Sequence, residues 1–541
     1  MAGTFIDAFE DRQPDGMRLS VWDRGGFTDL SWDDWRSRAE AAAAALRDMG
    51  IGAGARVGCI LTNAPSTCAA AIGVWLAGGC VVSLPTIGRG MDALEYIRSL
   101  RRMCAESGTQ LVLAEGRYAE QLAQAELEVP VAAYESLAGG GRAEPAPPGA
   151  GDVGFIQYSS GSTSTPKGCA LTMRAITAQL DMLAGRLDLQ GPHERGVSWL
   201  PLSHDMGFFG CLMLSFAKGM PLTLGTPGRY LRSPRTWLED CVRTAATITA
   251  VPNSGLRLGL DAVPGGAGGR FRMRKLVIGG ERVEESVLQA AVDVLGPAGL
   301  RRRDLLPAYG LAEAALAVTM PLVEEEPRVV HLRTDALLQG DLDVAASGDR
   351  AGATPCVSLG PPLDGVSLAI EGEGIGEILI DSPSLAEGYV GNPQLTAERF
   401  VSGTLRTGDL GFLDGGELFV VGRMDDMLCL GGRNVFATDV ESDLGALRGV
   451  RPGTPVLVEV PDGEAHRVVI LAEPETGSDD LEQIAEEMAV TAARVSGIRA
   501  DECLLLPPGA VPKTPSGKVQ RFRARQLLAE GGREAVARVS F

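Results

Sequence analysis

The strongest constraint on the fold lies between residues 57 and 85, where two apolar segments with β character flank a helical one. VGCIL (57–61) is typical of a buried strand, residues 66–77 have the composition of a helix, and CVVSLP (80–85) is typical of a second strand. A strand-helix-strand unit is the building block of a parallel sheet. The sequence therefore predicts an α/β fold.

The run CAAAIGVWLAGGCVVSL (68–84) could be mistaken for a membrane span. The pair Gly78 and Gly79 divides it into a short helix and a strand, which favours a buried helix-turn-strand. The N-terminus carries Asp and Glu where an export signal needs a basic start and an apolar run. We therefore expect no membrane span and a cytoplasmic location.

The composition narrows the class of protein. With 541 residues and 45% apolar content, the chain can form several domains or subdomains, and its net charge of −19 argues against a nucleic-acid-binding surface. Its 10 Cys form no CxxC pair and have mostly apolar neighbours, which indicates buried thiols in a reducing cytoplasm. Lys is rare among the 50 basic residues, yet it recurs in the Gly/Pro/Ser/Thr-rich segments 158–168 and 513–518. A Lys in such a segment suggests a site that needs a compact ammonium.

Further elements follow from local signals. Residues 31–49 predict a helix with Ser31 as the N-cap and Asp34 three residues later. VGFIQY (153–158) is typical of a buried strand, and ALTMRAITAQLDMLAGRL after Gly168 has helical spacing. The loop between them is therefore expected to join a sheet to a helix.

The sequence changes character in its C-terminal part. From Gly376 short β-type pieces follow one another, and after Gly422 new strand-like and helical segments suffice for a small α+β domain of about 120 residues. We place the boundary at 422–426. This predicts an N-terminal domain of residues 1–423 and a C-terminal domain of residues 424–541.

The loop YSSGSTSTPKG (158–168) is rich in hydroxyl groups and glycine and has no acidic side chain. Its hydroxyls and closely approaching backbone N–H groups, with the charge of Lys167, favour an anion such as the phosphates of a nucleotide. The Walker A pattern GxxxxGK[ST] is absent, and by composition alone a plain connecting loop is as common.

Four more motifs follow this loop in a fixed order, namely WLPLSHDMGFFG (199–210), YGLAEAALAVT (309–319), RTGDLGFLDGGELFVVGRMDDMLCLGGRN (406–434) and PKTPSGK (512–518). Together they resemble, over essentially the whole chain, the superfamily of adenylate-forming enzymes, which includes acyl-CoA synthetases, peptide-synthetase adenylation domains and luciferases. Within it, the fatty acyl-AMP ligase branch is the most similar, on WLPLSHDMGFFG, TAVPNSGLRL (249–258), IGGERV (278–283) and GGRNVFATDVE (431–441).

The resemblance implies a large N-terminal adenylate-forming domain, made of two packed α/β sheet subdomains and a β-rich subdomain, with a small mobile C-terminal α+β domain. It implies ATP and Mg²⁺ as cofactors. The implied reaction joins a carboxylate to the α-phosphate of ATP and expels pyrophosphate, so that extra negative charge on phosphorus must be stabilised by cations and hydrogen-bond donors.

The resemblance also assigns roles to single residues. Lys518 matches the catalytic Lys that bridges the carboxylate and the α-phosphate, and Glu313 matches the Mg²⁺-binding acid. Asp409 matches the acid that holds both ribose hydroxyls, a role that suits two acceptor oxygens. Arg423 matches the Arg beside the ribose. Asp425 matches the hinge about which the small domain rotates between two arrangements.

The nucleotide-binding match covers two more segments. Tyr309 and the preceding residues match the wall against which adenine stacks, and Gly310 is assigned to nucleotide binding with Tyr309. Thr163 is also a candidate metal ligand. The loop residues that match the β- and γ-phosphate site are Ser159, Ser160, Gly161, Ser162, Thr163 and Lys167.

Three residues are candidates for the acid-binding pocket. His204, in the SHDMG motif, is assigned to the catalytic set through acyl positioning; a carboxylate nucleophile has no proton to lose, and a structural His is the alternative. Asn253 matches a pocket-floor position, or it forms a turn at a strand end. Phe208 is the third candidate.

Several positions depart from the fatty acyl-AMP ligase pattern. Ser203 replaces the usual Tyr before His, Ser254 and Leu256 stand where aromatic residues are common, and Arg257 lies close by in sequence. These departures leave the length and polarity of the acyl pocket open. The branch also carries an insertion thought to hinder CoA use. Residues 366–377 and 398–409 leave little room for it, so that the exclusion of CoA does not follow.

The leading hypothesis is a free-standing ligase that makes an acyl adenylate and passes the acyl group to the phosphopantetheine thiol of a carrier protein, as in polyketide and nonribosomal-peptide pathways. No carrier segment follows Lys518, so that a separate carrier protein is expected. The alternatives are an acyl-CoA ligase, a relative that activates another oxyanion or transfers to an amine, and a nonenzymatic nucleotide-binding protein. The intact Lys518, Asp409 and Glu313 argue against the last.

Overall fold

The structure is a computed structural model of the chain. It describes residues 3–7, 17–87, 93–125, 127–139, 141, 144–159, 166–190, 193–266, 268–339, 341–346, 349–430, 433–462, 465–496, 499–513, 519–529 and 535–541.

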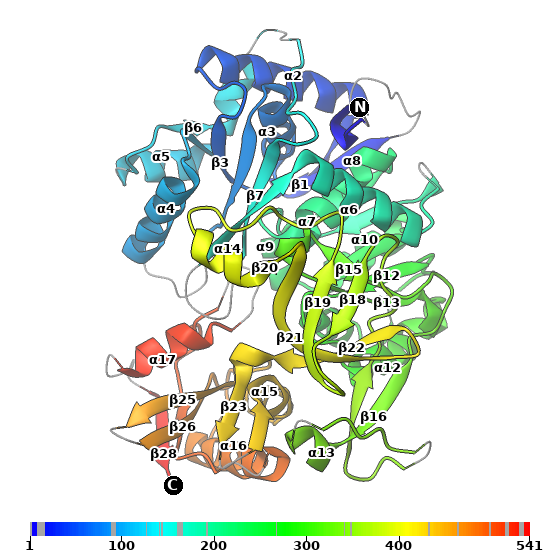
Figure 1. The fold of residues 1–541 in the computed structure, drawn as a ribbon, viewed down its shortest axis with the longest axis vertical. Coiled ribbons are helices and arrows are strands. Elements are labelled where there is room, and N and C mark those ends of the chain that lie inside the picture. The colour runs from blue at the N-terminus through cyan, green and yellow to red at the C-terminus, as the bar shows by residue number, and fades with distance from the viewer. Residues whose placement is uncertain are drawn as a thin grey trace.

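The predicted strand-helix-strand unit is confirmed. β3 (Arg56–Ile60) and β4 (Cys80–Leu84) are parallel neighbours joined through α3 (Pro65–Leu76), which is buried along most of its length. They belong to a six-stranded sheet of order β6-β5-β3-β4-β7-β8. The other strands are β5 (Leu111–Ala114), β6 (Val131–Ala133), β7 (Val153–Ser159) and β8 (Lys167–Thr172). α2 (Trp32–Asp48), α4 (Ala93–Ser107) and α5 (Gly116–Gln124) accompany this sheet (Figure 1).

A second, seven-stranded sheet has the order β13-β12-β11-β9-β10-β1-β2 and is parallel except for the pair of β1 and β2. Its strands are β1 (Arg18–Asp23), β2 (Gly26–Ser31), β9 (Gly196–Ser198), β10 (Leu222–Leu224), β11 (Ile248–Val251), β12 (Lys275–Ile278) and β13 (Leu305–Pro307). The helices between them are α6 (Met173–Arg186), α9 (Pro227–Arg232), α10 (Arg235–Thr244), α11 (Asn253–Asp261) and α12 (Glu285–Leu295). One continuous hydrophobic core contains side chains of both sheets. These are two packed α/β subdomains, as expected.

The loop at residues 160–165 does not join a sheet to a helix. β7 and β8 are antiparallel neighbours, with Ser159 opposite Lys167, so that the loop connects the two strands of a hairpin. The helix starts only at Met173, where the Thr172 side chain accepts a hydrogen bond from the N–H of Ala175. The segment has helical spacing, but its first residues find strand partners on both sides, because Gly168 and Ala170 also bond to residues 388–390.

The N-cap prediction for the first long helix is confirmed. Ser31 and Asp34 form a reciprocal capping box at the start of α2, with Asp34 N 3.1 Å from Ser31 Oγ and Ser31 N 3.1 Å from an oxygen of Asp34. Such a box satisfies two backbone donors that the first turn of a helix leaves unpaired.

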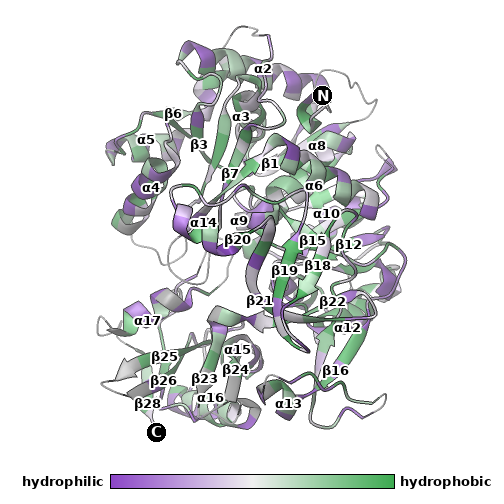
Figure 2. Ribbon diagram, in the orientation of Figure 1, coloured by the Kyte–Doolittle hydropathy of each residue, from purple (hydrophilic) through white to green (hydrophobic). Residues whose placement is uncertain are grey.

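A β-rich region follows the two sheets. Its five-stranded antiparallel sheet lies beside the second parallel sheet, in the yellow part of Figure 1, with α14 (Pro393–Arg399) at one edge. Its strands are β18 (Ser367–Ile370), β19 (Gly376–Asp381), β20 (Phe400–Val401), β21 (Thr404–Asp414) and β22 (Glu417–Arg423). Shorter elements of the region are β14 (Tyr309–Gly310), β15 (Ala317–Thr319), β16 (Val329–Arg333), β17 (Ala353–Val357) and α13 (Thr334–Gln339). In Figure 2 β19 is largely green and α14 largely purple, as expected for a buried strand and a surface helix.

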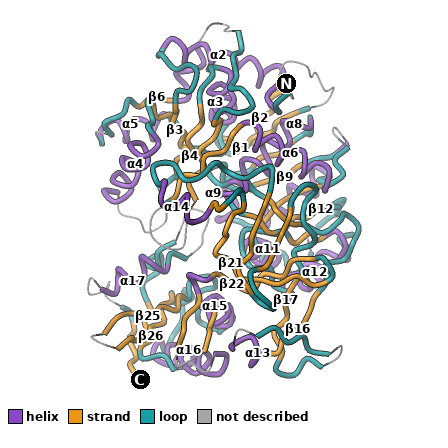
Figure 3. The backbone as a smooth tube through the Cα atoms, viewed as in Figure 1, coloured by secondary structure: helices purple, strands orange, loops and turns teal. Residues whose placement is uncertain are grey.

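The C-terminal part contains two hydrophobic clusters made entirely of residues beyond 427. It lies at the lower left of Figure 3, below the parallel sheets. Its strands are β23 (Met427–Leu430), β24 (Arg433–Phe436), β25 (Val456–Asp462), β26 (Ala465–Ala472), β27 (Glu502–Leu505) and β28 (Ala537–Ser540), and its helices are α15 (Ala437–Gly445), α16 (Leu481–Ser496) and α17 (Arg521–Ala529). These separate clusters agree with a small α+β domain. The boundary at 422–426 stays a prediction.

In the part of the chain that the structure describes, no helix has both the length and the apolar character to cross a membrane. The nine cysteines whose side chains are described are free and buried.

Candidate active site

The candidate residues converge because of the sheet topology. In the second parallel sheet, β9, β11, β12 and β13 are followed at their carboxyl ends by the segments that carry His204, Asn253, Glu281 and Tyr309. Carboxyl ends of parallel strands meet at one edge of a sheet, where ligands of α/β proteins bind. A cavity of about 1080 Å³ lies there, and its walls include segments of the β-rich region and of the C-terminal part.

Three of the predicted nucleotide residues touch one another. Asp409 on β21 lies directly across from Arg423 on β22, with Arg423 Nε 3.2 Å from Asp409 Oδ1. The hydroxyl of Tyr309 donates to Asp409 Oδ2 over 2.6 Å. Asp409 is only 8% exposed, and this burial raises its pKa although the Arg423 charge acts in the opposite direction. The structure thus groups Tyr309, Asp409 and Arg423 as the sequence predicts.

Gly310 follows Tyr309 in a strand that runs very close to β15. A Cβ atom at Gly310 would collide with the carbonyl oxygen of Leu316. Glycine is required here by close backbone packing next to Tyr309.

A second group is formed by Glu313, Tyr389 and Lys167. Tyr389 donates its hydroxyl hydrogen to Glu313 Oε1 over 2.8 Å, and Lys167 Nζ lies 5.8 Å from the centre of the Tyr389 ring. Backbone hydrogen bonds from Ala386 to Glu313 and from Val390 to Gly168 hold the three segments together. Burial raises the pKa of Tyr389 above its ordinary value, and the Glu313 charge adds to this effect, so that the ring stays a neutral donor.

Tyr389 is a residue that sequence reasoning missed. It lies in the segment EGYVG, 76 positions from Glu313 in the chain, and no spacing rule connects the two. A signal did exist in Gly388 and Gly391, because glycine in an extended segment often marks a close approach to another backbone.

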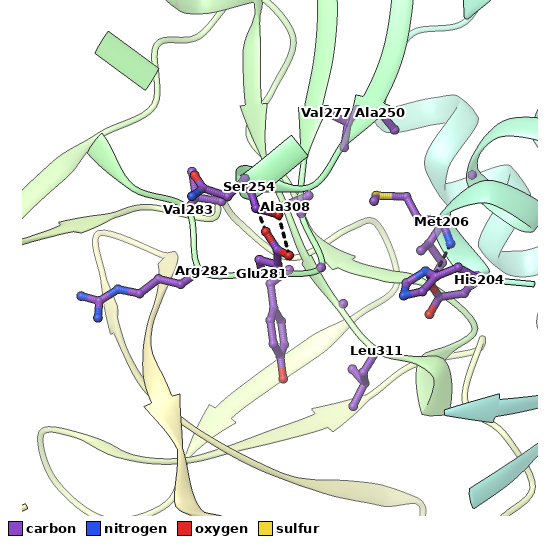
Figure 4. A pocket seen from close by; sticks show the side chains of 18 of the residues that line it. His204, Met206, Ala250, Ser254, Val277, Glu281, Arg282, Val283, Ala308 and Leu311 are labelled. Atoms are coloured by element: carbon purple, nitrogen blue, oxygen red, sulfur yellow. Dashed lines mark hydrogen bonds and ion pairs between the residues drawn. The ribbon is translucent and has the colours of Figure 1, made fainter. Parts of the chain in front are cut away.

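His204 stands at the start of a continuous helix formed by α7 (Asp205–Gly207), the π-helical turn η4 (Phe208–Met213) and α8 (Leu214–Lys218). Its Nδ1 lies 2.6 Å from Asp205 Oδ1, which fixes the orientation of the ring. The imidazole lies on the cavity wall together with Met206 and Leu311 (Figure 4). This position agrees with the predicted role in the pocket.

Phe208 lies elsewhere. It is fully buried and packs against Trp75 and Phe155, with ring centres 6.0 Å and 4.8 Å away. It is absent from the described residues that line the cavity, where the same helix presents Met206 and Gly210 instead. The geometry therefore assigns Phe208 to the contact between the two sheets and corrects its expected place in the pocket. The reason is helical geometry, because residues two positions apart point in different directions.

Asn253 is the first residue of α11 and is 5% exposed. Its Oδ1 accepts a hydrogen bond of 3.1 Å from the N–H of Glu284, which ties α11 to the segment before α12. Next to it, Ser254 donates from its N–H and Oγ to the Glu281 carboxylate over 2.8 Å and 2.9 Å, as Figure 4 shows. A carboxylate at a helix N-terminus is favourable, since the helix dipole is positive there.

Three of the residues that depart from the fatty acyl-AMP ligase pattern lie on α11. Leu256 is completely buried, and Arg257 points toward Glu284, with 2.7 Å between Arg257 Nη2 and Glu284 Oε2. Both Ser254 and Arg257 line the cavity, so that its mouth near α11 is polar and charged.

At the junction with the C-terminal part, Arg521 forms a buried cluster with two carboxylates that sequence reasoning did not single out. Its Nη1 lies 2.7 Å from Asp426 Oδ1 and its Nη2 lies 2.5 Å from Glu441 Oε2. Burial raises the pKa of Glu441 to about 6, although Arg521 acts in the opposite direction. Glu441 and Arg521 line the cavity.

Several predicted residues lie outside what the structure describes. These are Ser160, Gly161, Ser162, Thr163 and Lys518. Ser159 ends β7 and Asp425 lies in the short turn η8 (Met424–Asp426), but neither side chain is described.

The residue set fits a nucleotide-bound Mg²⁺ better than a metal held by the protein alone. Among the described residues, no three His, Cys, Asp or Glu side chains gather closely enough to hold a metal ion. At nucleotide sites Mg²⁺ takes most ligands from phosphates and water and needs only one or two carboxylates. Glu313 can supply one.

Comparison with known proteins gives consistent results. A family model described as AMP-binding enzyme matches residues 7–390. The 4-hydroxyphenylalkanoate adenylyltransferase of Mycobacterium marinum is 28% identical over 560 aligned positions, which cover 94% of this chain and 87% of that protein.

Two solved structures have closely similar folds. One comes from structural and functional studies of fatty acyl-adenylate ligases from E. coli and L. pneumophila; it has a TM-score of 0.86 at 25% identity and covers 98% of both chains. The other is McyG A-PCP complexed with phenylalanyl-adenylate, with a TM-score of 0.85 at 22% identity over 98% of this chain and 96% of that chain.

Proposed function

Because the chain belongs to the family of AMP-binding enzymes and is an adenylate-forming ligase, we propose that it joins a carboxylic acid to the α-phosphate of ATP and releases pyrophosphate. The observation that carries this proposal is the presence of the Asp409 group and the Glu313 group on one cavity. One group offers acceptors for a ribose, and the other offers a carboxylate and a nearby ammonium for a metal-bound triphosphate.

In the proposed nucleotide site, Asp409 accepts hydrogen bonds from both ribose hydroxyls. Each carboxylate oxygen can accept two hydrogen bonds, so that Asp409 retains this capacity after it has bonded to Tyr309. The adenine would lie against the segment of Tyr309 and Gly310. Burial raises the pKa of Asp409, and the Arg423 charge acts against this rise and favours the charged carboxylate, whose hydrogen bonds are the stronger ones.

The triphosphate is proposed to lie between the β7–β8 hairpin and Glu313. Lys167 starts β8 and supplies a charge for the β- and γ-phosphates, together with the hydroxyls and N–H groups of Ser159 to Thr163. Glu313 and Thr163 are the proposed protein ligands of Mg²⁺, and when bound this ion would neutralise phosphate charge. Tyr389 orients the Glu313 carboxylate through its hydrogen bond.

In the proposed chemical step, a carboxylate oxygen of the acid attacks the α-phosphorus. The new O–P bond forms as the bond to the bridging oxygen of pyrophosphate breaks, and that electron pair leaves with pyrophosphate. No proton is removed from the acid. The proposed role of Lys518 is to bridge the carboxylate and the α-phosphate and to stabilise the charge that develops on phosphorus. His204 is a proposed positioning residue for the acyl part.

The proposed second step transfers the acyl group to the phosphopantetheine thiol of a separate carrier protein, after rotation of the small domain about Asp425. CoA is the second candidate acceptor, because the fold leaves little room for the insertion that is thought to hinder CoA use. β18 and β19 are joined by the short turn 371–375, and β20 meets β21 through residues 402–403, so that neither hairpin holds an insertion. A relative named as an adenylyltransferase supports adenylation without naming the acceptor.

The test is carboxylate-dependent exchange of pyrophosphate into ATP, measured over acids from acetate through aromatic and amino acids to long fatty acids. A clear optimum is expected, and carrier protein and CoA can then be compared as acceptors. Lys518→Ala should lower the exchange by orders of magnitude while ATP binding changes little. Lys218→Ala is the control, because Lys218 pairs with Asp181 on the surface. If a folded protein that binds ATP shows no pyrophosphate exchange with any acid, the proposal is contradicted.

A further inference from the structure

The helix that begins after His204 forms one wall of the cavity over its whole length. Its side chains on the cavity are Met206, Gly210, Cys211, Leu214 and Ser215. They recur every four to five positions, as expected for one face of a helix that contains a π-helical turn. At 1.5 Å per residue, this face extends about 14 Å from Met206 to Ser215.

The opposite wall is the face of the parallel sheet. Ala250 and Val277 are partners on β11 and β12 and line the cavity next to His204 and Met206 (Figure 4). Deeper along the strands the lining continues with Gly196 and Ile248, which are partners at the amino ends of β9 and β11. The cavity therefore continues past the nucleotide end, between helix and sheet, toward the opposite edge of the sheet.

Apolar side chains make up most of this deep part. They are Leu183, Leu187, Leu214, Met220, Leu222 and Ile248. An acid whose carboxylate lies near His204 would place its chain among these residues. Such a lining suits methylene or ring carbons in the middle of the substrate.

Ser215 is a polar side chain at this deep end. It is 2% exposed, and its Oγ makes no hydrogen bond with any residue that the structure describes. A helical serine commonly bonds back to the carbonyl oxygen four residues earlier, but this one does not. A Cβ atom added at Gly196 would lie 3.7 Å from the Ser215 Oγ, so that the hydroxyl lies beside a strand position that has no side chain, and both residues line the cavity.

A second polar group without a partner lies on α6, a helix that also reaches the cavity. Gln179 on α6 is completely buried, and neither its Oε1 nor its Nε2 has a hydrogen-bond partner among the described residues. It precedes Leu183 by one helical turn, and Leu183 and Leu187 line the cavity. Positions 179, 183 and 187 share one face of the helix. Buried polar groups are nearly always paired, so that an unpaired hydroxyl on the cavity wall is suited to a polar group of a bound substrate.

We propose that the deep end of the cavity recognises a hydrogen-bonding group, a hydroxyl or a carbonyl, which the acid carries at the end remote from its carboxylate. Ser215 binds this group directly. The preferred substrate is then apolar in its middle and oxygenated at its far end, and it is not a plain saturated fatty acid. This inference rests on the proposed adenylation of a carboxylic acid.

The test compares matched pairs of acids, each an unsubstituted alkanoic acid and its terminal hydroxy derivative, from hexanoic to dodecanoic acid. The rate is pyrophosphate exchange, expressed as kcat/KM. At the length that reaches Ser215 we expect the hydroxy acid to be preferred about tenfold, the usual effect of one hydrogen bond to a buried, otherwise unpaired group. Ser215→Ala should remove most of this preference, with the larger loss of kcat/KM for the hydroxy acid.

Cys211→Ala is the matched control, because Cys211 lines the same helix face one turn nearer the entrance. It should change both acids of a pair by the same factor. An unchanged preference in Ser215→Ala, or a preference for the unsubstituted acid at every length, would overturn the inference.

Binding of the same acids by calorimetry separates this inference from the proposed reaction. If exchange is absent with every acid, the proposed adenylation fails, but the difference in affinity between the two acids of a pair still reports on Ser215. If Ser215→Ala binds the hydroxy acid as tightly as wild type does, the proposed recognition of the remote polar group is overturned.

Discussion

Arg521 and Glu441 form a doubly hydrogen-bonded pair in a buried position, with Nη2 2.5 Å from Oε2 and Nε 3.1 Å from Oε1. Arg521 also bonds to Asp426, at the end of the turn that precedes the C-terminal part. Arg521 follows Lys518 by three residues, so that this pair fixes the chain just after the proposed catalytic lysine.

We expect Arg521→Met to destabilise the protein by about 3–5 kcal/mol, because it leaves two buried carboxylates without their cation. Urea unfolding followed by fluorescence measures this loss. The double variant Arg521→Met with Glu441→Gln should recover part of it, since one of the two uncompensated charges is then gone. Additive losses in the double variant would contradict the pairing.

Glu441 predicts a pH dependence of stability. Its pKa is raised from 4.5 to about 6, so that the folded state binds a proton more readily than the unfolded state. The stabilising contribution is fully present below pH 4.5 and is lost as the pH rises through about 6. The shift corresponds to about 2 kcal/mol. Unfolding free energies at pH 4.5 and 7 should show this fall in wild type, and Glu441→Gln should reduce it. The exposed Glu482→Gln should leave it unchanged.

Asp409→Asn should weaken nucleotide binding by about ten- to one-hundredfold, because hydrogen bonds to a charged acceptor contribute about 1.5–3 kcal/mol. Calorimetry with ATP measures the effect directly. Asp414→Asn is the matched control, since Asp414 ends the same strand but is exposed and bonds to Arg328. Equal affinities for Asp409→Asn and wild type would rule out the ribose role.

Tyr389→Phe should raise the Mg²⁺ concentration needed for half-maximal exchange about fivefold, because Glu313 loses the donor that orients it. A Mg²⁺ titration of the exchange reaction measures this. Tyr134→Phe also loses a buried hydroxyl, which bonds to Ile60 O, and should cost similar stability without changing the Mg²⁺ requirement. A shift in both variants would show that the effect is not specific to Glu313.

Phe208→Ala should lower the free energy of unfolding by about 3–5 kcal/mol, the usual cost of deleting a buried aromatic ring, without changing which acid is preferred. Met206→Ala, two residues earlier and on the cavity wall, should change the preference among acids instead. Thermal unfolding and the exchange panel together distinguish the two positions. If Phe208→Ala changes which acid is preferred, Phe208 does contribute to the acid-binding pocket.

The elements that the sequence predicted well depend on neighbours in the chain. The capping box of α2 needs only Ser31 and Asp34, and the β3-α3-β4 unit follows from a local alternation of apolar segments and glycines. The grouping of Tyr309, Asp409 and Arg423 came from motif resemblance. It could not have been derived from spacing, since 100 positions separate Tyr309 from Asp409.

The parts that the sequence did not predict depend on distant partners. β8 forms a strand because β7 and residues 388–390 offer backbone partners on its two sides. These tertiary contacts outweigh the local helical pattern, and the sequence pattern alone does not reveal them. Tyr389 and Ser215 carry no motif, and their importance appears only when the fold places a carboxylate or an open space beside them. Phe208 lies in a motif, yet its direction on the helix removes it from the cavity.

The base of the β7–β8 hairpin is held from both sides, by β4 next to β7 and by residues 388–390 next to β8. Because these contacts hold both strands of the hairpin, the sheet sets the backbone position of Lys167, and no bound nucleotide is needed to place it. The cation proposed for the triphosphate is therefore attached to a rigid support, and the entropy of ordering its backbone is lost during folding and not during ATP binding.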